Sequence, residues 1–148
     1  ISFYAISFGA YILLNKLIGD KNTYKNIVLR SPAFNMKDIF TNCLLKEGFE
    51  EYKKNGKAKT GHGGKIIVPY SFYEDLIEHD LYIKYKEKRN ILIIQGVLDD
   101  TALITDTYRF ITNKPEFELI EMKNVKHHME PNEISVSTDI MLKRLKIT

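Results

Sequence analysis

Three residues in this chain have the side-chain types of a nucleophilic site built on serine. Ser7 follows a short apolar stretch, Asp99 follows the most apolar stretch of the chain, and His127 follows a later one. A histidine can take the proton of a serine hydroxyl, and a carboxylate can orient the imidazole ring and stabilise its cationic form. These residue types, in this order along the chain, predict acyl transfer through a serine nucleophile.

Ser7 occupies a turn in which a strand is expected to pass sharply into a helix. Its neighbours two positions before and after, Ala5 and Gly9, are small, and such a turn brings backbone segments close together. The free N–H groups at the start of the helix can stabilise an oxyanion, and the N–H of Phe8 is the expected donor. This segment alone leaves open a serine at a helix entry without a catalytic role, because short motifs recur by chance.

Asp99 and His127 each follow an expected strand. The run ILIIQG at 91–96 is a continuous apolar run ended by glycine, which is typical of a parallel strand buried on both faces. A carboxylate in the next loop lies at the carboxyl edge of the sheet, to which the serine turn also leads. Asp100 is expected to cap the following helix. His127 and His128 taken alone would be surface histidines, but the agreement of three residue types at three strand ends favours a site.

Extended and helical patterns alternate along the chain. Strands are expected at residues 1–5, 27–30, 66–70, 91–96 and 117–122. Helices are expected at residues 8–18, 37–45, 104–112 and 133–145, and one helix or a pair at 72–85. This alternation predicts the α/β class, with a mostly parallel sheet and flanking helices.

Composition and charge exclude several classes of function. The 148 residues are 44% hydrophobic and 28% charged, which is the composition of one globular domain. The net charge of +3 comes from lysines scattered among acids, without a basic stripe, so we expect no nucleic-acid partner. The apolar opening of the chain is shorter than the roughly 20 residues of a membrane span.

The cysteine and histidine content bears on compartment and metal binding. The single Cys43 cannot form an internal disulfide, and we take the cytoplasm as the default location. The four histidines lack the short, regular spacing of a metal site, and Cys43 has no candidate ligand nearby. We therefore expect neither a metal nor a cofactor.

Together the three candidate segments resemble the C-terminal part of an α/β-hydrolase of the serine-hydrolase type, in particular the bacterial esterases, lipases and aminopeptidase-like enzymes with a small helical cap. The stretch AISFGA at 5–10 corresponds to the nucleophile elbow, with alanine in place of the first glycine. GVLDD selects Asp99 as the acid, and LIEMKNVKHHM selects His127 as the base, with His128 as the alternative. The resemblance implies a small-molecule acyl substrate, Ser7 as the nucleophile, and no cofactor.

The resemblance also implies a domain organisation. Residues 1–148 would form a single partial α/β-hydrolase domain, with a cap-like insertion at about 36–89 that shapes the acyl or leaving-group pocket. Such a fold has several strands before the elbow, and a loop on one of them supplies the second oxyanion donor. We therefore expect a fragment of a longer protein, whose strand at 1–5 offers an apolar edge for pairing. A non-catalytic interaction module that kept the sheet is the alternative.

Overall fold

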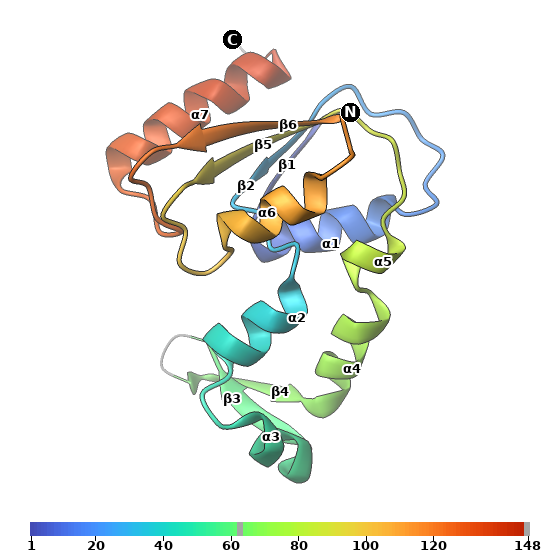
Figure 1. Cartoon of the computed structure of the whole chain (residues 1–148), viewed down its shortest axis with the longest axis vertical. Helices are drawn as coiled ribbons and strands as arrows, with labels where there is room; N and C mark the ends of the chain where they lie inside the picture. The colour runs from blue at the N-terminus through green and yellow to red at the C-terminus, as the bar shows by residue number, and fades with distance from the viewer. Residues whose placement is uncertain (62–63, 147–148) are drawn as a thin grey trace.

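The computed structural model describes residues 1–61 and 64–146, and its larger part is a parallel sheet between two layers of helices (Figure 1). The strands of this sheet are β1 (Phe3–Ile6), β2 (Ile27–Arg30), β5 (Ile91–Gly96) and β6 (Phe117–Met122). They lie in the order β1-β2-β5-β6, and each neighbouring pair is parallel. The predicted fold class, α/β with a mostly parallel sheet and flanking helices, is confirmed.

The strand side chains alternate between a larger hydrophobic core on one face of the sheet and a smaller core on the other. In β5, Ile91 and Ile93 belong to the larger core, whereas Leu92 and Ile94 belong to the smaller one. This period of two is the geometry of a strand. Every residue of β5 is buried, which explains why its sequence is apolar at nearly every position.

Helices cover both faces of the sheet. α1 (Phe8–Leu17) and α6 (Ile104–Ile111) pack on the larger core, and α7 (Pro131–Leu145) covers the opposite face (Figure 1). α7 begins two residues before its expected start, because Pro131 suits a first helical position and Glu130 forms a capping box with Glu133. Among the helices of the described residues, none has the length and apolar character needed to cross a membrane.

Residues 36–84 form a separate lobe below the sheet in Figure 1, which we call the lower lobe. Its helices are α2 (Met36–Ile39), the π-helical turn η1 (Phe40–Leu44), α3 (Phe49–Asn55), α4 (Tyr70–Glu78) and α5 (Leu81–Lys84). Its antiparallel hairpin consists of β3 (Lys57–Thr60) and β4 (Ile66–Pro69). Aromatic rings fill its interior, where Tyr52 is fully buried. That this lobe is a cap insertion at about 36–89 stays a prediction.

The lower lobe also differs most from the sequence-based expectation. The helix expected at 37–45 is a short α-helix that continues as a π-helical turn. The polar sequence of α3 and β3 has no regular apolar period, so the pattern does not predict these elements. The segment 72–85 is a pair of helices, because Asp80 begins a new one: its carboxylate accepts a hydrogen bond from the N–H of Tyr82 at 2.9 Å.

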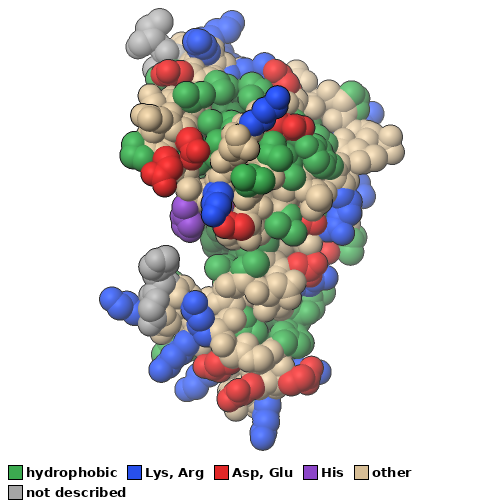
Figure 2. Space-filling view, turned by 60° about the vertical axis from the view of Figure 1, so that its left-hand side comes forward, with side chains coloured by type: hydrophobic (Ala, Val, Ile, Leu, Met, Phe, Trp, Pro, Cys, Tyr) green, Lys and Arg blue, Asp and Glu red, His purple; other side chains and the backbone are tan. Residues whose placement is uncertain are grey.

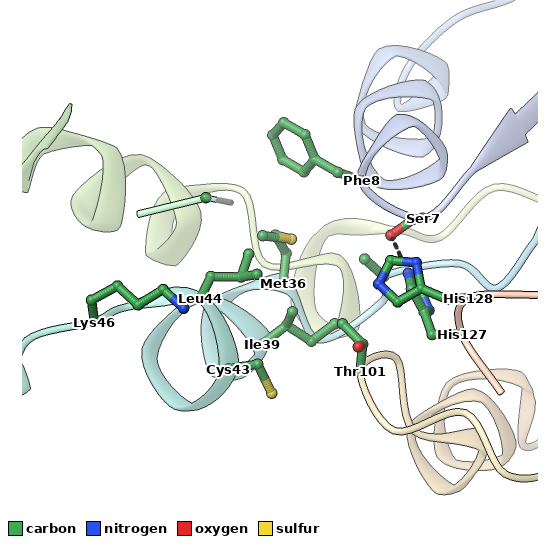
Figure 3. A pocket seen from close by; sticks show the side chains of 12 residues that line it. Ser7, Phe8, Met36, Ile39, Cys43, Leu44, Lys46, Thr101, His127 and His128 are labelled. Atoms are coloured by element: carbon green, nitrogen blue, oxygen red, sulfur yellow. Dashed lines mark hydrogen bonds between the residues drawn. The ribbon is translucent and has the colours of Figure 1, made fainter. Parts of the chain in front are cut away.

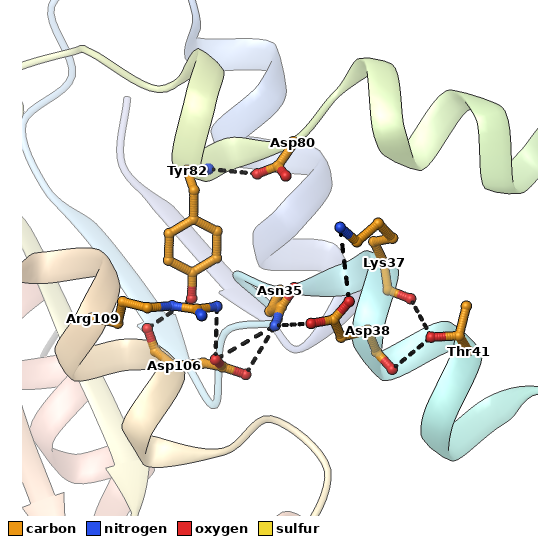
Figure 4. Close-up of polar contacts among 8 residues, drawn as sticks. All are labelled: Asn35, Lys37, Asp38, Thr41, Asp80, Tyr82, Asp106 and Arg109. Atoms are coloured by element: carbon orange, nitrogen blue, oxygen red, sulfur yellow. Dashed lines mark hydrogen bonds and ion pairs between the residues drawn. The ribbon is translucent and has the colours of Figure 1, made fainter.

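A polar cluster joins the lower lobe to α6 (Figure 4). Nδ2 of Asn35 donates to Asp38 at 2.8 Å and lies 3.4 Å from Oδ2 of Asp106. Arg109 pairs with Asp106 at 3.0 Å, and its guanidinium lies 4.3 Å from the ring centre of Tyr82. The Tyr82 hydroxyl donates to the backbone carbonyl of Asp106 at 2.9 Å, and burial raises the pKa of Tyr82 to about 12, so it remains a donor. These contacts hold α2 and α5 against the sheet layer.

Candidate active site

Ser7 lies in a strained turn between β1 and α1. Its φ of 49° and ψ of −119° fall in a region that residues other than glycine rarely adopt, at a cost of about 1–3 kcal/mol. Backbone hydrogen bonds hold the turn: the Ser7 N–H donates to the Arg30 carbonyl at 3.0 Å, and the Ser7 carbonyl accepts from the N–H of Ala33 at 3.2 Å. The ends of β1 and β2 thus hold the serine at the carboxyl edge of the sheet.

His127 lies in the loop after β6 and forms hydrogen bonds with both of the other candidate residues. Its Nε2 lies 3.0 Å from the Oγ of Ser7 (Figure 3), and its Nδ1 lies 3.0 Å from each carboxylate oxygen of Asp99. Because a carboxylate accepts, the ring proton belongs on Nδ1 and leaves Nε2 to accept from the serine hydroxyl. The His127 side chain is 12% exposed and that of Asp99 is 0% exposed, so little water competes for these bonds.

Backbone donors hold the Asp99 carboxylate in one orientation. Its Oδ1 accepts from the N–H of Ala102 at 2.8 Å and from that of Thr101 at 3.1 Å. Asp100 is exposed, and its carboxylate lies 3.5 Å from the Thr101 hydroxyl. The expectation that Asp100 caps the following helix is wrong, because α6 has Leu103 at its N-cap. The structure therefore brings Asp99, and not Asp100, to the histidine.

His128 lies beside His127, with the two ring centres 5.6 Å apart and the rings nearly perpendicular. It is exposed and lines the same cavity as Ser7. Within the described residues, its ring forms no hydrogen bond with Ser7 or Asp99. The contact with the serine is thus made by His127, and the role of His127 as the base stays a proposal.

Gly96, the last residue of β5, allows the loop that carries His127 to come close. A Cβ at this position would lie 2.2 Å from the carbonyl oxygen of Val125. The same carbonyl accepts a hydrogen bond from the N–H of Leu98 at 2.9 Å, so the acid loop and the histidine loop are joined directly. Sequence reasoning treats Gly96 only as the end of a strand and misses this role. A glycine placed between a buried strand and a candidate acid is the signal that could have indicated it.

We expect the substitution Gly96→Ala to lower the free energy of unfolding by about 1–3 kcal/mol. The added methyl group must displace the backbone of Val125 and with it the loop of His127. Urea unfolding measures this effect.

Gly9→Ala is the matched control for this prediction. A Cβ at Gly9 would meet no atom of the described residues within 4 Å, so the interpretation that position 9 is small because of a close backbone contact is wrong. Alanine in the first turn of α1 should stabilise the helix by up to about 1 kcal/mol. A Gly96→Ala protein as stable as the Gly9→Ala protein would contradict the role assigned to Gly96.

Phe8 is the first residue of α1, so its N–H has no acceptor within the helix. It lines the same cavity as Ser7 and His127. Its ring stacks on that of Tyr11, with centres 5.8 Å apart, and points away from His127 (Figure 3). The use of its N–H as an oxyanion donor stays a prediction.

A cavity of about 370 Å³ lies beside Ser7, between the sheet layer and the lower lobe (Figure 3). Figure 2 shows the surface hollowed between these two parts, with a histidine at the upper edge of the hollow. The volume is within the range of small-molecule sites. The lower lobe lines the cavity with apolar side chains of α2 and η1, among them Met36, Ile39 and Leu44. Sequence reasoning assigns a pocket to this segment without identifying these residues.

No protein-family model matches the chain, and no curated protein matches its sequence. Solved structures do match. Alpha/beta hydrolase domain-containing protein 10 from mouse superposes with a TM-score of 0.71 at 16% identity, over 97% of this chain and 62% of that chain. Est1E from Butyrivibrio proteoclasticus superposes with a TM-score of 0.71 at 17% identity, over 97% of this chain and 60% of that chain. This chain has part of an α/β-hydrolase fold.

The chain order of the three hydrogen-bonded residues can be compared with the order known for the α/β-hydrolase fold. Enzymes of this fold carry their triad in the order Ser, Asp or Glu, His, with each residue at a strand end. Ser7, Asp99 and His127 follow that order after β1, β5 and β6. A monoacylglycerol lipase from Paleococcus ferrophilus matches as well, with a TM-score of 0.64 at 10% identity, over 96% of this chain and 66% of that chain. The chain thus spans about 60% of the length of the first solved proteins it matches.

Proposed function

We propose that the protein is a serine hydrolase that cleaves a carboxylic ester or a related acyl bond through an acyl-enzyme intermediate. The observation that carries this proposal is the continuous run of hydrogen bonds from Ser7 through His127 to Asp99 at the edge of a cavity. The structural neighbour described as a monoacylglycerol lipase favours an ester substrate. We assign this activity to the cytoplasm.

The first half of the reaction forms the acyl-enzyme. The Oγ of Ser7 attacks the carbonyl carbon while its proton moves to the Nε2 of His127, and the Asp99 carboxylate stabilises the resulting imidazolium. The carbonyl electron pair moves to oxygen, and we assign the Phe8 N–H as a donor to this oxyanion. When the pair returns to carbon, the bond to the leaving group breaks, and the leaving oxygen takes the proton from Nε2 and departs as an alcohol.

The second half of the reaction releases the acid. A water molecule loses a proton to the Nε2 of His127 and attacks the acyl carbon, which again places negative charge on the carbonyl oxygen. Collapse of this intermediate breaks the bond to the Oγ of Ser7, which regains the proton from His127. The products are a carboxylic acid and the free serine, so the site is ready for another turnover.

A fluorophosphonate probe tests the proposal directly, because it reacts with activated serines. We expect a single phosphonylated peptide that contains Ser7, identified by mass spectrometry, and no labelling of the Ser7→Ala variant. Ser71→Ala is the matched control, since Ser71 is an exposed serine on α4 and its removal should leave the labelling unchanged. Folded protein without an adduct at Ser7 would contradict the proposal.

A second candidate function is that of a non-catalytic interaction module. β1 is an edge strand of the described sheet and pairs with β2 on one side. An open strand edge can pair with a strand of another chain. In that case the probe would leave Ser7 unmodified, and the substitutions Ser7→Ala and His127→Ala would leave partner binding unchanged.

A further inference from the structure

The cavity beside Ser7 runs along α2 and η1 toward Lys46 (Figure 3). Between the serine hydroxyl at one end and the lysine at the other lie the side chains of Met36, Ile39 and Leu44. The cavity therefore has a nucleophile at one end, an apolar middle and a cation at the far end. A ligand that matches all three parts has an electrophilic carbon, an apolar chain and an anion.

The ammonium group of Lys46 has no acidic partner in the cavity. No Asp or Glu is among the described residues that line the cavity, and the ion pairs found among residues 1–61 and 64–146 do not include Lys46. The positive charge of this ammonium group can therefore attract an anionic group of a ligand. A carboxylate suits it, because a charge-assisted hydrogen bond forms between the two groups.

The charges of the lower lobe are unevenly distributed. Residues 36–84 contain eight lysines and eight acidic residues, whereas residues 52–69 contain five lysines and no acidic residue. In the view of Figure 2, basic side chains lie along the lower edge of the hollow. Side chains with one sign of charge beside a cleft raise the local concentration of ligands with the opposite charge.

We propose that the protein acts on esters in which the acyl or the alcohol part is an apolar chain that ends in a carboxylate, and that Lys46 binds this carboxylate. The inference rests on the proposed hydrolase function and specifies its substrate class. The apolar chain is stabilised by burial against Met36, Ile39 and Leu44. Lys46 is itself exposed, so water screens the ion pair and its contribution to kcat/KM is modest.

The test compares kcat/KM for esters that differ only in the terminal group. One pair, 4-nitrophenyl hexanoate and mono-4-nitrophenyl adipate, places the carboxylate on the acyl side. The other pair, hexyl acetate and 6-acetoxyhexanoate, places it on the alcohol side. In at least one pair we expect the wild-type protein to favour the anionic ester about three- to fivefold, Lys46→Met to remove this preference, and Lys46→Glu to reverse it.

Lys53→Glu is the matched control, because Lys53 is exposed on α3, outside the cavity, and its substitution changes the net charge by the same amount. We expect Lys53→Glu to keep the wild-type preference. If it altered the preference as much as Lys46→Glu does, a general field of the lobe would be responsible, and the assignment of Lys46 would be overturned.

Failure of the inference and failure of the hydrolase function give different results. Turnover with the same ester preference in the wild-type and Lys46→Met proteins would overturn the inference and leave the hydrolase function intact. Absence of all turnover would refute the hydrolase function, and binding then decides the role of Lys46. When the lysines are ¹³C-methylated, the NMR signal of Lys46 is the one that is missing from the spectrum of the Lys46→Arg protein. Monomethyl adipate should shift this signal, and methyl hexanoate should not. An unshifted signal would overturn the role of Lys46 as well.

Discussion

Replacing His127 with alanine is expected to lower the kcat of ester hydrolysis by about 10⁵- to 10⁶-fold. The Oγ of Ser7 would lose the imidazole that now lies 3.0 Å away, to which the proposed mechanism assigns the roles of base and acid. His127 is also a hydrogen-bond partner of the fully buried Asp99 carboxylate, so we expect the free energy of unfolding to fall by about 1–3 kcal/mol. Hydrolysis of a 4-nitrophenyl ester and urea unfolding provide the two measurements.

His128→Ala is the matched control for this substitution. The two histidines are adjacent in sequence and line the same cavity, but the hydrogen bonds to Ser7 and Asp99 are those of His127. The His128→Ala protein should retain most of its activity. A large loss in His128→Ala together with a small loss in His127→Ala would assign the base to His128 and contradict the geometry described above.

Replacing Asp99 with asparagine is expected to lower kcat by about 10⁴-fold while leaving the fold intact. The amide oxygen of asparagine can still accept from the N–H groups of Thr101 and Ala102, so the loop keeps its anchors. The amide nitrogen is a donor, however, and would face the Nδ1 of His127. Nδ1 would then become the acceptor, the ring proton would move to Nε2, and Nε2 could no longer take the serine proton.

The tautomer of His127 provides a readout that a purely structural role for Asp99 would not change. We expect ¹⁵N NMR of the neutral ring to show the proton on Nδ1 in the wild-type protein and on Nε2 in the Asp99→Asn protein. Asp100→Asn is the matched control: its side chain is exposed, and neither the tautomer nor kcat should change. Loss of activity in Asp99→Asn without a change of tautomer would mean that the carboxylate acts in another way.

The sheet layer shows how far local pattern predicts structure. The apolar run at 91–96 predicts a strand buried on both faces, and all six residues of β5 are buried. The alternation of extended and helical segments predicts the parallel order, because a parallel neighbour requires a crossover connection. These features depend on neighbours in sequence, and the structure confirms the fold class that follows from them.

The lower lobe shows where local pattern fails. Tyr52 is fully buried although it lies in the polar sequence FEEYKKN, and its hydroxyl donates to the carbonyl of Pro69 at 2.6 Å. Its burial comes from packing against aromatic residues such as Phe40 and Tyr70, which are distant in the chain. A short helix of this kind is stabilised by tertiary packing more than by its own helix propensity, so its sequence shows no regular apolar period.

The sequence by itself determined the α/β class and the residue types that could form a serine site, since both depend on the order of segments and on the turns between them. The sequence resemblance selected His127 with His128 as the alternative, and the tertiary structure shows that His127 is the one that contacts a serine 120 positions away. Only the tertiary structure shows that Gly96 lies against the Val125 carbonyl and that Lys46 lines the far end of the cavity. Each of these contacts joins segments from different parts of the fold. Such distances are set by the packing of the whole domain and not by neighbours in sequence.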